Sequence, residues 1–302
     1  MKPIRVLPNN PSMEGICTLI PNVEFACPDG ISLKLHLIMP LPAETPAGSP
    51  AGETIKKRYP LIVFVQGSAW VKPNQNFEIP QLSWFARRGY VIATVTHRTC
   101  FEAAAPAFLQ DVKSSIRFLR AHADEYSIDP ERVAIWGTSS GGNTALLVGV
   151  TGGMPELDAG DNLDQSSEVK AVVDCFGPTD LVKMATKQYV DKNGEPVREG
   201  QNIFEALAGH ALSAHDLAGL EPLRRISPIS YVEPGKNFPS FFILHGDADP
   251  VVLYEDSVAM YEKLIDCGYD AEMLRVTGAP HEGSFWSRAL HEEVAAFLDA
   301  HL

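Results

Sequence analysis

The stretch Val133-Ala134-Ile135-Trp136-Gly137-Thr138-Ser139-Ser140-Gly141-Gly142 decides the fold of this chain. An apolar run that predicts a buried strand leads into a turn of glycine and serine, and a run of helical character, 143–150, follows. This strand–turn–helix setting predicts a nucleophile elbow, in which a tight turn lifts a serine hydroxyl above a sheet. The alternative is an ordinary Gly/Ser turn. The setting favours Ser139 as nucleophile over Ser140, which lies one place off the centre of the motif.

A nucleophilic serine needs a base, and the base needs a carboxylate that orients it. On this fold the chain order is serine, then acid, then histidine. Asp249 follows the apolar run 241–244 and begins Asp-Pro-Val-Val, so we predict it as the acid, whereas Asp247 is expected to hold the turn. We predict His281, in the loop after the expected last strand, as the base. His245 precedes the acid and is interpreted as a structural residue.

The loop after the apolar run 61–65 is the expected source of oxyanion-hole amides. It reads Gln66-Gly67-Ser68-Ala69-Trp70, and its small residues let backbone amides face a substrate oxygen. We predict the N–H groups of Ser68, Ala69 and Ser140 as donors. Trp70 directly follows these donors and is predicted to contact the substrate.

Short apolar runs alternate with amphipathic stretches along the rest of the chain, and this alternation predicts an α/β fold with a mostly parallel sheet between two layers of helices. Strands are expected at 31–37, 61–65, 91–95, 132–136, 169–176, 241–244 and 271–276, and helices at 107–122, 143–150, 254–267 and 286–298. Residues 181–229 break the alternation and are interpreted as a small cap within a single domain of residues 1–302.

The composition disfavours some classes of binding partner and cofactor. The 302 residues include 25 basic and 38 acidic side chains, a net charge of −13 that disfavours nucleic acid and anionic membranes. Without an apolar leader, and with five scattered cysteines and no C-x-x-C pair, the chain is expected to be cytoplasmic. Because His210 and His215 are spaced too widely for a helical metal pair, we expect no metal, and no cofactor either. Homo-oligomerisation stays open.

Taken together, these motifs resemble esterases of the α/β-hydrolase superfamily, most closely the branch of bifunctional acetyl/feruloyl esterases that act on plant cell-wall polysaccharide. The similar stretches are 60–70, 111–113, 116–120, 128–133, 136–143, 227–232 and 245–252. Two stretches depart from the branch's pattern. Its His-Gly-Gly-Gly-Trp is Gln66-Gly67-Ser68-Ala69-Trp70 here, so the loop must be held without the histidine, and its Gly-x-Ser-Ala-Gly-Gly carries Ser140 in place of alanine.

The resemblance implies a serine carboxylic ester hydrolase that removes acetyl or feruloyl groups from plant polysaccharide or oligosaccharide through an acyl-enzyme. Phe77 and Phe204 are further aromatic residues that could face a sugar or feruloyl ring. A prolyl-oligopeptidase-like peptidase or an aryl formamidase would use the same triad. The chain has no room for the propeller that such peptidases usually carry. A non-catalytic, adhesion-type relative would lack a triad member, and none is missing.

Overall fold

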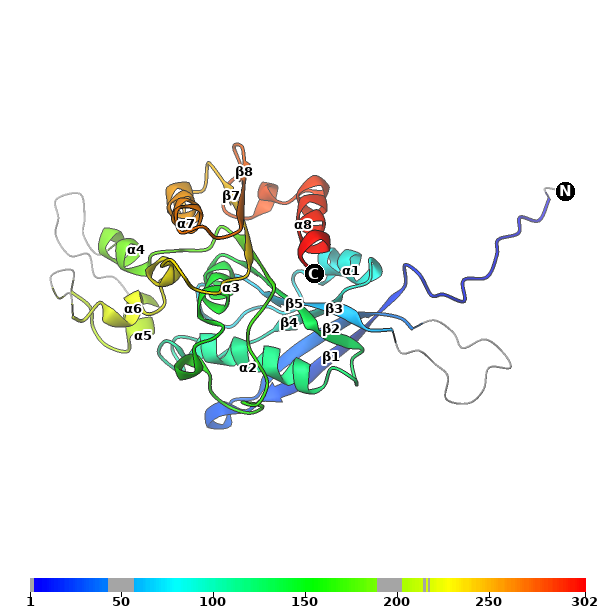
Figure 1. Ribbon diagram of the computed structural model, residues 1–302, viewed down its shortest axis with the longest axis horizontal. Coiled ribbons are helices and arrows are strands. Elements are labelled where there is room, and N and C mark those ends of the chain that lie inside the picture. Colours follow the sequence, from blue (N-terminus) through cyan, green and yellow to red (C-terminus); the bar gives the residue numbers. More distant parts are fainter. Residues whose placement is uncertain (1–2, 43–56, 189–202, 214–215, 217) are drawn as a thin grey trace.

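The apolar runs of the sequence form the strands of one eight-stranded sheet in a computed structural model, which describes residues 3–42, 57–188, 203–213, 216 and 218–302. The strands are β1 (Cys17–Ala26), β2 (Leu33–Pro40), β3 (Tyr59–Val65), β4 (Val91–Val95), β5 (Ile128–Thr138), β6 (Ala171–Cys175), β7 (Ser240–Gly246) and β8 (Ala271–Val276). Their order is β1-β2-β4-β3-β5-β6-β7-β8. Strands β3 to β8 run parallel to one another, and β2 and β1 extend one edge of the sheet, where β2 pairs antiparallel with β4 and β1 pairs antiparallel with β2 (Figure 1).

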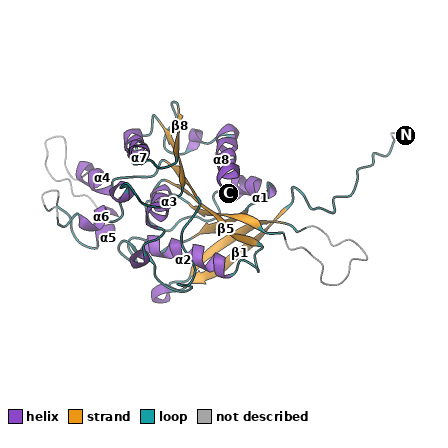
Figure 2. Ribbon diagram, viewed as in Figure 1, coloured by secondary structure: helices purple, strands orange, loops and turns teal. Residues whose placement is uncertain are grey.

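Helices cover both faces of the sheet (Figure 2). They are α1 (Ile79–Arg87), α2 (Ala107–Ala121), α3 (Ser140–Thr151), α4 (Leu181–Gln188), α5 (Ile203–Ala208), α6 (Glu221–Arg224), α7 (Tyr254–Asp266) and α8 (Arg288–His301). The sheet separates two apolar cores: α2, α3 and α7 contribute to one, and α1 and α8 to the other. The chain therefore has the α/β-hydrolase architecture that the alternation of strands and helices predicts.

Every strand expected from the sequence is present, and two elements were not anticipated. Strand β1 is one of them, because most of its residues are exposed and its pairing with β2 is interrupted between Ile20 and Val23, where Asn22 has a positive φ of 59°. Helix α1 is the other, because it is short and contains Pro80.

Helices α4, α5 and α6 form the described part of the expected cap, and they lie together at one end of the molecule (Figure 1). The cap is joined to the body by the amide of Ala105, which donates to the Leu207 carbonyl at 2.9 Å, and by an ion pair between Lys183 and Asp256. Residues 189–202, 214–215 and 217 of the cap lie outside the described residues. We keep the assignment of 181–229 as a cap within one domain as a proposal.

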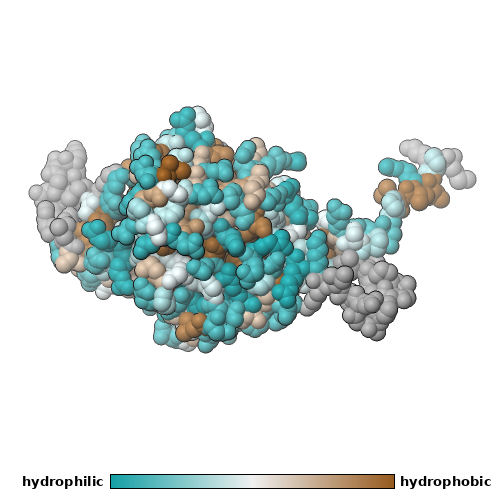
Figure 3. All heavy atoms as spheres, viewed as in Figure 1, coloured by the Kyte–Doolittle hydropathy of each residue, from teal (hydrophilic) through white to brown (hydrophobic). Residues whose placement is uncertain are grey.

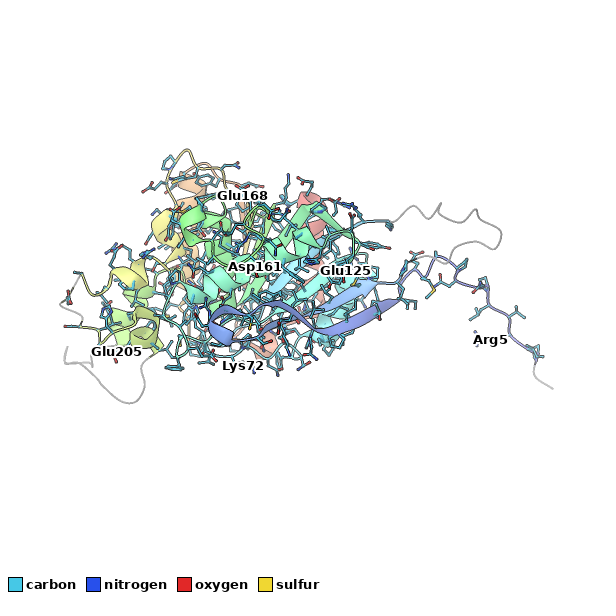
Figure 4. All side chains as sticks on the ribbon, turned by 90° about the horizontal axis from the view of Figure 1, so that it is seen from below. Arg5, Lys72, Glu125, Asp161, Glu168 and Glu205 are labelled. Atoms are coloured by element: carbon cyan, nitrogen blue, oxygen red, sulfur yellow. The ribbon has the colours of Figure 1, made fainter. Side chains whose placement is uncertain are left out.

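The N-terminal arm extends away from the body at the end opposite the cap. Figure 4 shows Arg5 on this arm and Glu205 on α5 at opposite ends. The arm exposes Ile4, Val6 and Leu7, and Figure 3 shows hydrophobic atoms gathered near its end. In the part of the chain that the structure describes, no helix is both long and apolar enough to cross a bilayer.

Candidate active site

The elbow between β5 and α3 holds Ser139 in a strained backbone conformation, with φ 52° and ψ −123°. A non-glycine residue in such a conformation costs on the order of 1–3 kcal/mol and is kept only where its surroundings enforce it. A β-carbon at Gly137 would lie 1.9 Å from the Gly141 carbonyl oxygen, and one at Gly141 would lie 2.0 Å from the Val65 carbonyl oxygen. The tight turn therefore requires glycine at both positions, as the motif predicts.

His281 connects the elbow to the acid loop. Its Nε2 lies 2.9 Å from Ser139 Oγ, and its Nδ1 lies 2.7 Å from Asp249 Oδ2. The ring packs against Phe176, with ring centroids 4.6 Å apart, and its side chain keeps 14% of its surface exposed. The structure thus brings the predicted nucleophile, base and acid into one hydrogen-bonded series that is open to solvent at the serine end. In this arrangement a neutral imidazole can accept the serine proton.

Asp249 is held by four donors. Its Oδ1 accepts the amides of Val251 and Val252 at 2.8 and 3.0 Å, and its Oδ2 faces both His281 and His245. Burial alone would raise the pKa of Asp249, but hydrogen bonds from the two histidines and the two amides hold this pKa well below its ordinary value. The carboxylate therefore stays charged opposite His281.

Asp247, the other candidate for the acid of the triad, instead contacts residues of the neighbouring turn. Its Oδ1 accepts the amide of Gly278 at 2.5 Å, and Arg275 lies 3.6 Å from its Oδ2. Among the described residues, no hydrogen bond joins Asp247 to His245 or His281. Asp247 thus ties this loop to the one that carries His281, as expected for a turn residue.

The elbow itself holds the oxyanion loop. Thr138 Oγ1 accepts the amide of Gly67 at 2.8 Å, and Ser140 Oγ accepts the amide of Ser68 at 2.9 Å. The Ser68 amide is therefore already used, and its prediction as an oxyanion donor does not fit this geometry. Among the described residues, no acceptor is found for the amides of Ala69 and Ser140. These two amides remain the oxyanion donors that we propose.

Trp70 is placed differently from the prediction. Its ring is only 3% exposed and packs against Phe108, with centroids 6.2 Å apart, so it is a core residue without a free face for a sugar. Ala69 and Trp70 both have positive φ, 50° and 56°, and the Val71 amide closes their turn on the Ser68 carbonyl at 3.0 Å. Because the turn inverts the backbone direction, it buries Trp70 and leaves Ala69 exposed.

Other aromatic residues remain accessible on loops that follow β3 and β4. Phe77 and Phe101 are 57% and 46% exposed, whereas Phe204 of the cap is 4% exposed. Val251 and Leu253, beside the acid, are also exposed. The loops at the carboxyl ends of β3, β4 and β7 thus present apolar side chains. Phe101 was missed by the sequence reasoning, which had followed only the oxyanion loop and the cap.

Two buried carboxyl groups outside the predicted triad were also not anticipated. Burial raises the pKa of Asp174 in β6 to about 7, and its Oδ2 has no hydrogen-bond partner among the described residues. Burial, and secondly the charge of Glu282, raises the pKa of Glu78 at the start of α1 to about 7. Neither carboxyl group belongs to a recognisable sequence motif. Their pKa shifts arise mainly from burial in the folded chain, which a local sequence pattern does not reveal.

Metal-binding groups do not converge in the described residues, where no cluster of three or more histidine, cysteine or carboxylate side chains could hold an ion. The ring nitrogens of His210 face the carbonyls of Ala208 and Gly219, and His215 lies outside the described residues. A cavity of about 910 Å³ lies at the amino ends of β6 and β7, where Lys170 and Ser240 line it. This cavity is at the opposite end of the strands from Ser139, so it is not the catalytic pocket.

Comparisons with known proteins identify a matching family and several similar esterases. The model of the BD-FAE family matches residues 50–264, a range that includes Ser139 and Asp249 and ends before His281. The chain is 28% identical to the esterase LipC of Mycobacterium tuberculosis over 209 residues, which are 69% of this chain and 49% of LipC. It therefore spans about half the length of this curated relative.

Solved structures of carbohydrate esterases are similar over most of the chain. A truncated carbohydrate esterase from gut microbiota superimposes with a TM-score of 0.72 at 28% identity, covering 97% of this chain and 99% of that one. A bifunctional GH43-CE protein of Bacteroides eggerthii gives a TM-score of 0.73 at 28% identity, covering 96% of this chain and 38% of that one. The fold is thus that of the esterase branch of α/β-hydrolases.

Proposed function

The chain belongs to the BD-FAE family of esterases, and from this we propose that it is a serine carboxylic ester hydrolase acting through an acyl-enzyme. The observation that carries the proposal is the series Ser139–His281–Asp249, with distances of 2.9 and 2.7 Å, placed on a strained elbow. This arrangement supplies a nucleophile, a base and an orienting carboxylate in the order that acyl transfer requires.

In the proposed acylation step, Ser139 Oγ attacks the ester carbonyl carbon while His281 Nε2 takes the hydroxyl proton. The carbonyl oxygen becomes an oxyanion, and in this proposal the amides of Ala69 and Ser140 donate hydrogen bonds to it. The Ser140 amide lies in the first turn of α3, where the helix dipole also favours negative charge. When the tetrahedral intermediate collapses, the bond to the alcohol breaks and the imidazolium gives its proton to the leaving alkoxide.

In the proposed deacylation step, water attacks the acyl-enzyme with His281 again acting as base. The bond between the acyl carbon and Ser139 Oγ then breaks, and the imidazolium returns its proton to Oγ. The acyl group leaves as the carboxylic acid, which ionises in solution. Asp249 stays ionised throughout and stabilises the imidazolium that forms in each half-reaction. No residue outside the hydrogen-bonded series is needed to balance protons.

For the natural substrate we propose acetyl or feruloyl esters of plant polysaccharide or oligosaccharide. The carbohydrate esterases among the similar structures support this class. Phe77 and Phe101 give it local support, because exposed aromatic rings on the loops after β3 and β4 suit stacking on a sugar or a feruloyl group. The acidic net charge of −13 favours neutral acylated sugars over anionic ones.

A substrate panel tests this proposal: acetylated xylan, methyl ferulate, p-nitrophenyl acetate, N-formylkynurenine and a prolyl peptide amide. We expect turnover of p-nitrophenyl acetate together with acetylated xylan or methyl ferulate, all abolished in Ser139→Ala. Good turnover of the formamide or the peptide amide, with none of any ester, would reject the esterase proposal. Turnover of simple esters alone would leave the triad in place and reject the carbohydrate substrate.

A further inference from the structure

We infer that His245 is a positioning residue for the acid of the triad and that Ser257 fixes the ring orientation of His245. The inference rests on the proposed function, because it concerns how Asp249 is held opposite His281. The sequence suggested only that His245 closes strand β7. In the structure its ring contacts Asp249.

Both ring nitrogens of His245 have polar partners. Nε2 lies 3.2 Å from Asp249 Oδ2 and 3.1 Å from the Val252 carbonyl oxygen, and Nδ1 lies 2.7 Å from Ser257 Oγ. His245 and Ser257 are fully buried, and Asp249 is 8% exposed. Without competing water, these hydrogen bonds are stronger than the same contacts at a surface.

The hydrogen-bond partners of His245 determine which of its ring nitrogens carries a hydrogen. Nε2 faces a carboxylate and a carbonyl, which only accept hydrogen bonds, so it must carry a hydrogen. Nδ1 faces a hydroxyl, which can donate to it. The network is therefore satisfied by a neutral ring, with Ser257 donating to His245 and His245 donating to Asp249. A protonated ring would need Ser257 to accept, and no second partner for that hydroxyl is found among the described residues.

Asp249 Oδ2 therefore receives two ring N–H groups, one from each histidine. The donor from His245 draws part of the negative charge of Oδ2 away from His281 and limits rotation of the carboxylate about its last bond. Without this donor, a more concentrated charge would face His281 and favour its protonated, catalytically inactive form. The base would then require a higher pH to accept the serine proton.

Other charges around the site stay in place when His245 is replaced. Glu282 follows His281 in the same loop, and Glu78 approaches Glu282 from the start of α1. On the acid loop, Asp247 is bound to Gly278 and Arg275. At the start of α7, Asp256 is paired with Lys183 of α4. A change in pH dependence after replacement of His245 can thus be assigned to the Asp249–His281 contact.

The test compares His245→Leu, which removes the donor, with His245→Gln, whose amide can still donate to Asp249. Loss of one charge-assisted hydrogen bond predicts a fall in kcat/KM of about 10- to 100-fold for p-nitrophenyl acetate in His245→Leu, with KM little changed. The acid limb of its pH profile should move to higher pH, and His245→Gln should restore most of both properties. Rates are divided by the concentration of sites that a fluorophosphonate titrates, so that unfolded protein does not count.

Ser257→Ala provides a milder variant that retains the histidine. We expect kcat/KM to fall by about 5-fold, since one neutral hydrogen bond is lost. Ser115→Ala is the matched control, because Ser115 is also a buried helical serine and, within the described part of the chain, its hydroxyl bonds only to the Val112 carbonyl. The control should stay within about 2-fold of the wild type.

Proton NMR gives a second readout that does not depend on catalysis. The wild type should show two low-field ring N–H resonances, one of which disappears in His245→Leu while the other, from His281, shifts. An inactive wild type that still shows these resonances would reject the proposed function and retain the inference. Superimposable pH profiles of the wild type and His245→Leu, together with an unmoved His281 resonance, would overturn the inference while leaving the esterase proposal intact.

Discussion

Replacing Asp249 by asparagine changes a single functional group in the proposed catalytic series. Two backbone amides, from Val251 and Val252, point at Oδ1 and demand an acceptor there. The asparagine oxygen must therefore occupy this side, and its NH₂ group then faces His281 Nδ1. Because NH₂ only donates, Nδ1 would have to accept, and the ring proton would move to Nε2. His281 would then present a proton to Ser139 instead of a lone pair.

The expected loss follows from this forced tautomer. In the well-known serine protease triad, the same change lowers kcat by about 10⁴-fold. We expect a similar fall here, equivalent to about 5.4 kcal/mol in the activation free energy. Binding of a short ester does not involve Asp249, so KM for p-nitrophenyl acetate should change little.

Asp247→Asn is the matched control, two residues away in the same loop. Asparagine keeps an oxygen for the Gly278 amide, so kcat/KM should stay within about 3-fold of the wild type, with a loss of stability below about 1 kcal/mol. Both variants are assayed on p-nitrophenyl acetate across pH 5–9. A greater loss of kcat in Asp247→Asn than in Asp249→Asn would refute the assignment of the acid.

Three more substitutions test features around the elbow. Ala69→Gly should raise the free energy of unfolding by about 1 kcal/mol, because glycine relieves the positive φ of 50°; a decrease in a urea titration would contradict this. Ser140→Ala removes the acceptor of the Ser68 amide, so kcat/KM should fall about 10-fold, whereas an unchanged rate would show that the loop needs no such anchor. Asp174 has its pKa raised by burial from 3.8 to about 7, so the folded state binds this proton more tightly and stability falls as pH rises between these values. Asp174→Asn should therefore match the wild type near pH 4 and exceed its unfolding free energy by at most about 4 kcal/mol at pH 8; equal stability at both pH values would exclude a neutral Asp174.

The parts of the site that local patterns specify could be predicted from the sequence. The elbow is contiguous, and its glycines are required by clashes within a few residues of Ser139. Asp249 and His281 are distant in sequence, but each follows a strand whose carboxyl end reaches the same edge of a parallel sheet. Topology alone therefore brings them to Ser139. The buried apolar strands could be predicted as well, because a short run of apolar residues is the sequence pattern of a strand that is buried on both faces.

The parts that depend on side-chain direction could not be predicted. Trp70 follows the oxyanion loop in sequence, yet two successive positive φ values turn it into the core. The amide of Ser68 was expected to face the substrate, but the hydroxyl of Ser140, 72 positions away, takes it. The role of His245 likewise depends on a contact with Ser257 of α7, which no pattern within β7 reveals.

Labelling with a fluorophosphonate tests the central claim most directly, because the reagent forms a covalent bond only with an activated serine. We expect one phosphonyl group per chain by intact mass, carried by Ser139 in peptide mapping. Labelling should cease in Ser139→Ala and become slower at low pH, where protonated His281 cannot accept the serine proton. Modification at Ser140, or undiminished labelling of the Ser139→Ala variant, would contradict the account.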